Sequence, residues 1–343
     1  MDRKNFIATL LPLTAASNAI GIATGFNETP LSAIKKIPPY LKKGDTIGIT
    51  CPAGYITAAE IEPAVHTLKE WGYTVKIGNT VGKRDGTFGG TDEERKNDVQ
   101  QLLDDENIKA ILFARGGYGV VRIIDAINFK KFIANPKWLI GFSDITILHS
   151  HIHQLFGIAT VHAKMCNSFI KDWSIAEPTQ IESIQSIQQC INGTTMQYNA
   201  PFNSSNKLGK ATGILVGGNL KTIESLSGSK SDITTHGKIL FVEDTGEYLY
   251  SIDRMFWNLK RSGKLNELAG LIIGGFKIKK EESDSEAFGK TLEQIVLEKI
   301  SNAKFPVCFD FAVGHQKNNM ALKCGVKHQL TVTANHTTLK EII

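Results

Sequence analysis

Short apolar runs alternate with amphipathic stretches along the first half of the chain. Four of these runs have the length of buried strands and lie at residues 46–50, 73–77, 110–114 and 138–140. Between them, apolar residues recur at helical spacing, as in Ile61, Val65 and Leu68. Strands that alternate with helices predict a doubly wound, mostly parallel sheet. Ligands bind such sheets beyond the carboxyl ends of the strands.

Signals for helix ends support this alternation. Thr91-Asp-Glu-Glu94 is a capping box, and it predicts the start of a helix that carries Val99 and Leu102. Gly72 predicts the end of the preceding helix.

Apolar residues lose their regular spacing between about 165 and 210, and the apolar runs that follow differ from those of the first half. The later runs are mostly strand-like and lie at residues 213–216, 238–242, 270–273, 307–309 and 329–332. Many short strands with two or three helices predict a β-rich α+β domain. We therefore expect four regions: a signal-like segment and linker (1–40), an α/β domain (41–165), a linker region (166–210) and a β-rich C-terminal domain (211–343).

Composition narrows the classes of protein. A length of 343 residues is typical of two domains, and the net charge of +5 comes without a dense Lys/Arg cluster, so nucleic acid is not expected as a partner. The five cysteines form no C-x-x-C pair, which argues against a zinc site or a disulfide framework.

The N-terminus has the features of a secretory signal peptide. Its start is basic, residues 7–16 form an apolar run, and Ala15-Ala16-Ser17 offers small residues for cleavage. This pattern predicts a periplasmic protein; the alternative is a frayed amphipathic end on a cytoplasmic enzyme. The apolar run is too short to span a membrane, and no later segment qualifies, so no integral membrane segment is expected.

The corner at residues 141–144 is the first candidate site. A predicted strand ends at Ile140, and Gly141-Phe-Ser-Asp144 leaves almost no loop before the next helical pattern. A serine at such a turn projects its hydroxyl over the carboxyl edge of the sheet, near backbone N–H groups that suit an oxyanion. Ser143 is therefore a candidate nucleophile. The alternative is that Ser143 is only the N-cap of the helix.

The glycine-rich segment Arg115-Gly-Gly-Tyr-Gly119 is the second candidate site. It follows a predicted strand, and its N–H groups suit a phosphate or an oxyanion because glycine lets the backbone approach a ligand. The segment matches neither G-x-G-x-x-G nor the Walker A motif, which disfavours a nucleotide site. A tight turn without a ligand is the structural alternative.

Three histidines crowd the helix predicted after Ser143. His149 and His153 are four residues apart, as metal ligands on a helix are, but Ser150 stands where the zincin motif has glutamate. We interpret these two and His151 as structural or solvent-facing, and we expect no metal.

Two further polar groups follow strands in the second half. Glu243 begins the acidic sequence Glu-Asp-Thr-Gly-Glu, and His315 follows the run at 307–309. Taken singly, such carboxylates suit a glycosidase pair or a solvated strand end, and a single histidine is usually structural. With Ser143 they give the chain order Ser…acid…His, one of the known orders of a catalytic triad. Serine needs a histidine base and an acid that orients it.

At these positions the chain resembles the LD-carboxypeptidase family, the serine peptidases of the S66 type. The resemblance covers about residues 41–335 and is carried by Cys51-Pro-Ala-Gly54, Gly89-Gly-Thr-Asp-Glu-Glu-Arg95, Ala114-Arg-Gly-Gly-Tyr-Gly119, Gly141-Phe-Ser-Asp-Ile-Thr146, Gly217-Gly-Asn-Leu220, Val242-Glu-Asp244, Asp310 and Gly314-His315. Val120-Val121 stands where members often carry small or hydroxyl residues. His162-Ala-Lys-Met165 stands where a Gly-Pro pair is usual, and this departure is expected to reshape the substrate cleft.

The resemblance implies a Ser-His-Glu triad shared between the two domains. The implied site residues are Ser143 as nucleophile, His315 as base and Glu243 as its orienter; Gly116, Gly117 and Asp144 as oxyanion-hole N–H donors; and Arg115, Tyr118 and Asn219 as substrate contacts. The family also implies a homodimer and no cofactor.

The function that the resemblance implies is serine carboxypeptidase activity on murein peptides. The enzyme is expected to cleave the L,D-peptide bond before a terminal D-alanine in murein tetrapeptides, in recycling or remodelling of the cell wall. One alternative is a microcin-immunity-like peptidase that cleaves peptide–nucleotide antibiotics at the same triad. Another is a wall-peptide binding protein with a degenerate site.

Overall fold

The first sheet has six strands and carries the corner at Ser143. In the computed structural model, which describes residues 36–280 and 287–342, these strands are β1 (Thr46–Thr50), β2 (Thr74–Ile77), β3 (Ile108–Phe113), β4 (Trp138–Gly141), β5 (Thr160–His162) and β11 (Leu322–Cys324). Their order across the sheet is β11-β5-β4-β3-β1-β2. Strands β1 to β5 are parallel, and β11 is antiparallel to β5. The predicted parallel sheet is confirmed, but its edge strand β11 comes from the C-terminal half. The predicted signal peptide lies outside the described residues.

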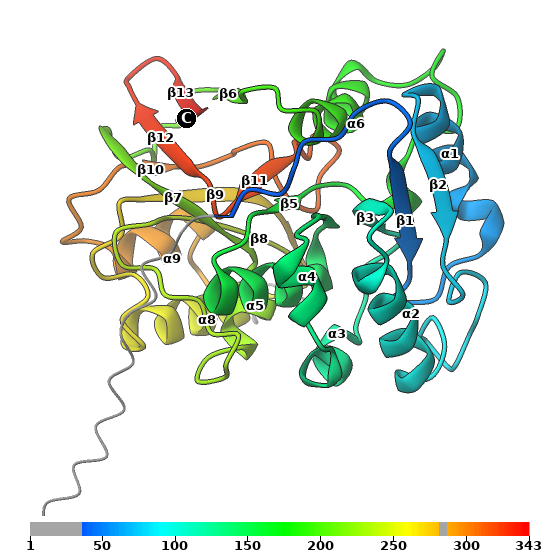
Figure 1. Ribbon diagram of the computed structural model, residues 1–343. Helices are drawn as coiled ribbons and strands as arrows, with labels where there is room; N and C mark the ends of the chain where they lie inside the picture. The colour runs from blue at the N-terminus through cyan, green and yellow to red at the C-terminus, as the bar shows by residue number, and fades with distance from the viewer. Residues whose placement is uncertain (1–35, 281–286, 343) are drawn as a thin grey trace, which may run out of the picture. The chain divides into compact units, whose positions relative to one another are not determined.

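Helices cover both faces of the first sheet (Figure 1). Those on one face are α2 (Asp92–Asp104), α3 (Val120–Ile123), α4 (Lys130–Ala134) and α5 (Thr146–Phe156); those on the other are α1 (Ala58–Glu70) and α6 (Pro178–Ile191). Single 3-10 turns lie at η1 (Ile124–Ala126), η2 (Ser143–Ile145) and η3 (Cys166–Ser168). The capping box predicted at Thr91 and Glu94 is present, and it starts α2. These helices make the first sheet doubly wound, as predicted.

The stretch predicted as a linker region, 166–210, contains ordered core structure. It holds α6 and strand β6 (Gln197–Ala200). Ile184, Ile187 and Ile191 of α6 are fully buried against the first sheet. The glutamines and serines between these isoleucines weaken the apolar signal, so the sequence pattern did not predict the helix.

The second sheet has seven strands and is half parallel. Besides β6, its strands are β7 (Gly209–Asn219), β8 (Ile239–Glu247), β9 (Gly270–Ile278), β10 (Val307–Cys308), β12 (Lys327–Val332) and β13 (Thr337–Glu341). The order is β10-β9-β8-β7-β12-β13-β6; β7 to β10 are parallel, and the remaining strands pair antiparallel. The β-rich second domain is thereby confirmed.

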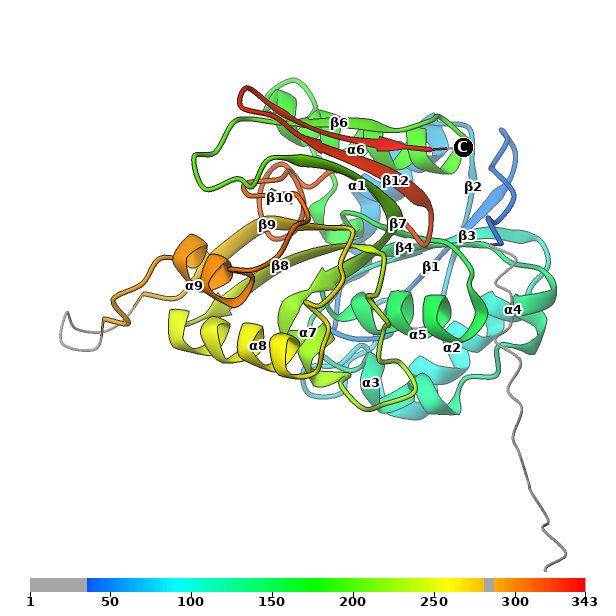
Figure 2. The ribbon, with the colours of Figure 1, turned by 90° about the vertical axis from the view of Figure 1, so that its left-hand side faces the viewer.

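Three helices pack on one face of the parallel half of the second sheet (Figure 2). They are α7 (Leu220–Ser225), α8 (Leu249–Arg261) and α9 (Leu292–Lys299). The opposite face shares its core with the first sheet, since Phe241 of β8 lies in the same buried cluster as Trp138 of β4. Through the described part of the chain, no helix is both long and apolar enough to cross a bilayer.

Candidate active site

Ser143 occupies the sharp corner between β4 and α5. Phe142 is still extended, whereas Ser143 has a φ of +61° and is one of the few non-glycine residues in the left-handed region. This conformation costs a residue with a Cβ about 1–2 kcal/mol, and such strain is often found at functional sites. The backbone therefore holds Ser143 in the turn that the sequence predicted.

The glycine-rich segment packs directly against Ser143. A Cβ on Gly116 would lie 3.2 Å from the Ser143 Oγ, so any side chain there would occupy the space beside the hydroxyl. The Gly116 carbonyl accepts a hydrogen bond of 3.0 Å from the Gly54 N–H. Gly117 has a φ of +113°, which favours glycine. The predicted role of this segment beside the candidate nucleophile is consistent with its position.

The Asp144 carboxylate ties the glycine-rich segment to the corner. It accepts a hydrogen bond of 2.9 Å from the Val120 N–H, and its side chain is buried. Burial raises the pKa of Asp144 to about 6, although the bond from Val120 and the charge of Arg95 act in the opposite direction. Its carboxylate faces the loop, so only its backbone N–H remains a candidate for the oxyanion hole.

Glu243 and His315 form a close pair. The Glu243 Oε2 lies 2.5 Å from the His315 Nδ1 and also accepts the His315 backbone N–H at 3.2 Å. Glu243 is fully buried in β8. Burial alone would raise the pKa of this carboxyl, but the neighbouring rings of His162 and His315 outweigh it and lower the pKa to about 2. Glu243 is therefore ionised and orients the imidazole of His315 through Nδ1.

Two residues shape the loop that carries His315. Gly314 has a φ of +100°, and a Cβ there would lie 2.3 Å from the Glu243 Cβ, so only glycine fits. The Gly314 N–H donates to the Asn319 Oδ1 at 2.9 Å, and the Asn319 N–H donates to the Ser183 Oγ at 3.0 Å. Helix α6 therefore helps to position His315, a contribution that the sequence analysis missed.

Ser143 and His315 line the same cavity of about 540 Å³. The Phe142 ring beside the corner lies 4.8 Å from the His315 ring. No hydrogen bond joins the Ser143 hydroxyl to His315 among the described residues, and in ligand-free enzymes such bonds are often long. Arg115, Gly116 and Gly117 also line this cavity. The structure thus gathers the three predicted catalytic residues, with Glu243 behind His315.

Two predicted substrate contacts lie elsewhere. Tyr118 is exposed and packs on Phe88, with 6.0 Å between ring centroids. Asn219 caps α7 by accepting the Thr222 N–H at 3.0 Å, and its amide donates to the Asp244 carboxylate at 3.0 Å. Neither is among the residues that line the cavity in the described part of the chain. Asn219 holds α7 and β8 together, whereas its substrate role stays a prediction.

His162 lies near the other carboxylate oxygen of Glu243, the one that His315 does not contact. Its ring is fully buried, and its Nε2 lies 3.9 Å from the Glu243 Oε1, beyond hydrogen-bond distance. Neither ring nitrogen of His162 has a hydrogen-bond partner in the described structure. The sequence analysis named His162 only within a departure from the family pattern. A search for buried histidines at the ends of predicted strands would have singled it out.

The histidines of α5 do not converge. The His149 Nε2 lies 2.8 Å from the Gly141 carbonyl, and the His151 Nδ1 lies 2.9 Å from the Ser231 Oγ. Burial lowers the pKa of His149 to about 3, so it is a neutral core residue. The described ranges contain no group of three His, Cys, Asp or Glu side chains placed to hold a metal ion.

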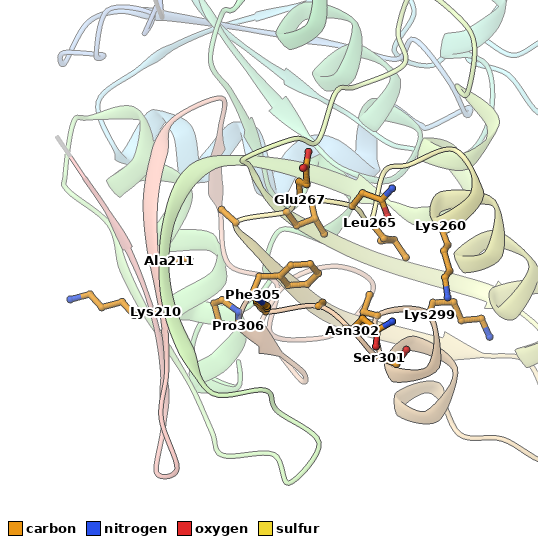
Figure 3. A pocket seen from close by; sticks show the side chains of 16 residues that line it. Lys210, Ala211, Lys260, Leu265, Glu267, Lys299, Ser301, Asn302, Phe305 and Pro306 are labelled. Atoms are coloured by element: carbon orange, nitrogen blue, oxygen red, sulfur yellow. The ribbon is translucent and has the colours of Figure 1, made fainter.

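A second cavity, of about 650 Å³, lies at the amino ends of the parallel strands of the second sheet (Figure 3). Lys210 at the start of β7, Ala269 before β9 and Pro306 before β10 line it. Its buried cation, Lys299, is ion-paired with Asp253 and Glu298. None of the predicted catalytic residues lines this cavity.

The chain belongs to the LD-carboxypeptidase family. Residues 47–163 match the model of the LD-carboxypeptidase N-terminal domain, and residues 212–330 match that of the C-terminal domain. Because it belongs to this family, the protein is a peptidase, that is, a hydrolase that cleaves peptide bonds at the carboxyl end of its substrates.

Three individual proteins illustrate the similarity. A Bacillus subtilis protein described as a "probable murein peptide carboxypeptidase" is 36% identical over 310 residues, which cover 89% of this chain and 94% of that protein. The microcin C7 self-immunity protein of Escherichia coli is 27% identical, over 84% of this chain and 90% of its own. The crystal structure of muramoyltetrapeptide carboxypeptidase from Oxalobacter formigenes has a TM-score of 0.77 at 25% identity and covers 86% of this chain and 98% of its own.

Proposed function

We propose that this protein is a serine-type LD-carboxypeptidase that removes the terminal D-alanine from murein tetrapeptides. The observation that carries the proposal is the 2.5 Å contact between the Glu243 carboxylate and His315, on the wall of the cavity that Ser143 also lines. Similarity to the Bacillus subtilis and Oxalobacter formigenes carboxypeptidases supports the choice of substrate.

The proposed reaction begins at the Ser143 hydroxyl. The His315 Nε2 accepts the hydroxyl proton as Oγ attacks the carbonyl carbon of the L,D bond, while Glu243 holds the Nδ1 proton. Backbone N–H groups of Asp144 and of Gly116 or Gly117 stabilise the resulting oxyanion. His315 then protonates the departing amine of D-alanine, which leaves an acyl-enzyme on Ser143. Water, deprotonated by His315, hydrolyses this ester and regenerates the serine.

The direct test is to incubate the purified protein with a murein tetrapeptide and to measure free D-alanine. Release by the native protein, and its loss in Ser143→Ala, are the expected results. If the native protein binds the tetrapeptide and releases no D-alanine, the protein is a wall-peptide binding protein with a degenerate site.

A second candidate function is peptide–nucleotide hydrolysis. It is favoured by the 27% identity to the microcin C7 self-immunity protein. The same preparation, given an aminoacyl-sulfamoyl nucleoside, separates the two candidates: faster cleavage of that compound than of the tetrapeptide favours the immunity-like function.

We also propose export to the periplasm and assembly as a homodimer. Export rests on the signal-like pattern of residues 1–17, and the dimer rests on the family resemblance. N-terminal sequencing of the protein from a periplasmic extract tests the first. Light scattering of the purified protein tests the second.

A further inference from the structure

The cavity at Ser143 is lined by cations. Arg115, Lys164, Lys277 and Lys317 all contribute to its wall, and no Asp or Glu is among its lining residues in the described part of the chain. Lys317 is paired with Glu177 at 2.5 Å, and the Arg115 guanidinium donates to the Tyr55 carbonyl at 3.0 Å. Glu177 offsets the charge of Lys317, whereas the bond to a neutral carbonyl leaves the charge of Arg115 in place. The remaining positive charge therefore comes from Arg115, Lys164 and Lys277.

Lys164 is the unusual member of this set. Its residue is only 8% exposed, yet it makes no hydrogen bond or ion pair with any described residue. The other buried lysines and arginines of the described chain all have partners. They are Arg95 with Asp92, Lys137 with the Leu102 and Asp105 carbonyls, Lys264 with Asp232, Lys299 with Asp253, and Lys323 with Glu341.

A largely buried lysine without an ion-pair partner has lost part of its hydration and gained no opposite charge in return. The Lys164 ammonium is not itself among the fully buried atoms of the described chain that lack a partner, so it faces the cavity. Burial lowers the pKa of Lys164, and the charge of Lys277 lowers it further. Lys164 lies two residues after β5, and the Ala163 N–H between them donates to the Gly141 carbonyl at 3.1 Å, so the backbone is held close to the sheet. A ligand that brings negative charge into the cavity would supply the missing opposite charge.

We propose that Lys164, assisted by Lys277, forms a subsite for a carboxylate of the peptide substrate beside the bond that Ser143 attacks. The inference rests on the proposed peptidase function. Two carboxylates on the residues that flank the scissile bond of a murein tetrapeptide have this chemistry: that of the terminal D-alanine, and the side-chain carboxylate of a diaminopimelate at the L-centre. A lysine at the L-centre has no such group and brings a like charge.

The experiment compares Lys164→Met, which keeps the length of the side chain without its charge, with Lys164→Arg, which keeps the charge. Four tetrapeptides serve as probes: one with diaminopimelate, one with diaminopimelate amidated at its side-chain carboxylate, one with lysine, and one with diaminopimelate and a terminal D-alaninamide. Lys210→Met, at the second cavity, controls for the loss of one positive charge. The measurement is kcat and KM for release of the terminal residue.

Lys164→Met is expected to lower kcat/KM for the diaminopimelate peptide by roughly 10- to 100-fold, as for loss of a charged hydrogen bond. Lys164→Arg should retain most of the activity. If the side-chain carboxylate is the ligand, the amidated and lysine peptides will be insensitive to Lys164→Met. If the terminal carboxylate is the ligand, only the D-alaninamide peptide will be insensitive.

Equal losses on all four peptides, or no loss on any, would overturn the subsite. Failure of the proposed function looks different, because the native protein would then release nothing from any of the four. Thermal unfolding gives a second readout: Lys164→Met should raise the Tm of the ligand-free protein, since it removes an uncompensated buried charge. A lowered Tm, with full activity, would make Lys164 a structural residue.

Discussion

The two cavities at opposite ends of the second sheet differ in how their charges are satisfied. The larger, at the amino ends of the strands, has a volume of about 650 Å³, and its buried Lys299 is paired with Asp253. The smaller, of about 540 Å³, has Ser143 and His315 in its wall and the unpartnered Lys164. Volume does not separate them, because a third cavity of about 720 Å³ adjoins the smaller one and shares His315, Gln316 and Lys317 with it. A strained backbone at Ser143, an oriented imidazole at His315 and a lysine that has no ion-pair partner within the described ranges set the smaller cavity apart.

The strongest test of this comparison is to replace one serine in the wall of each cavity with alanine. Ser143→Ala should lower turnover of the tetrapeptide by on the order of 10⁴-fold or more, as loss of a triad serine does in other hydrolases. Ser301→Ala, in the wall of the larger cavity, should leave turnover unchanged. Steady-state D-alanine release measures both.

A retained tenth of native turnover in Ser143→Ala would remove Ser143 from the mechanism. The left-handed backbone at Ser143 provides a stability test that shows whether Ser143→Ala keeps the native turn. Ser143→Gly should be about 1 kcal/mol more stable than Ser143→Ala, because glycine adopts a φ of +61° without strain. Urea denaturation compares the two.

The next largest effect is expected from Glu243→Gln. Losing the orienting carboxylate costs a comparable triad about 10⁴-fold in kcat, and we expect a loss of this order. The pH dependence of stability supplies an independent test. The pKa of Glu243 is lowered from 4.5 to about 2 in the folded protein, so its ionised form stabilises the fold above pH 4.5.

This stabilisation is lost as the pH falls from 4.5 through about 2. The native protein should therefore lose stability relative to Glu243→Gln over that range. Urea midpoints at successive pH values measure the difference. If the difference stays constant with pH, Glu243 is not held ionised by its histidines.

Lys299 has an ion-pair partner and Lys164 has none among the described residues, so substitutions of these two buried lysines should have opposite effects. Lys299→Met should destabilise the protein by about 3 kcal/mol, because it strands the Asp253 carboxylate. It should not change kcat/KM, whereas Lys164→Met should reduce activity and stabilise. Thermal unfolding and kinetics on both variants decide the matter: similar behaviour of the two would mean that pairing does not distinguish the cavities.

The smallest expected effect tests whether α6 helps to position His315. Ser183→Ala removes the acceptor for the Asn319 N–H, so the loop of His315 should loosen and kcat should fall several-fold. Ser186→Ala is the matched control, since its hydroxyl accepts the Ala321 N–H, further from Gly314. Both variants should lose about 1 kcal/mol of stability. Equal kcat values would show that α6 does not position His315.

Local patterns predicted the parts of the molecule that depend on local physics. Strands β1 to β4, the capping box at Thr91 and the turn at Ser143 follow from apolar runs and from residues with strong positional preferences. The chain order of Ser143, Glu243 and His315 was readable because each follows or lies on a predicted strand. Their meeting in space came from the resemblance, since no periodicity specifies how two sheets pack.

The features that were missed depend on long-range contacts. The serines of α6 read as polar in the sequence, but they are buried because they bond the backbone of residues 319–321. The sequence suggests that Asn219 is a surface amide, but its side chain caps α7 and donates a hydrogen bond to Asp244. Lys164 was visible only as a departure from a family pattern. Its burial and lack of a partner needed the fold.

Strand β11 has a consequence for the order in which the protein becomes active during synthesis. It pairs Leu322 with His162 and Cys324 with Thr160, and so covers β5 and becomes the edge strand of the first sheet. A growing chain that has emerged only as far as Ser143, or even as far as His315, still has β5 as an open edge. Such a distant pairing forms late, because the loop that it closes is long. A nascent peptidase of this design therefore acquires its hydrolytic power only after nearly the whole polypeptide has left the ribosome.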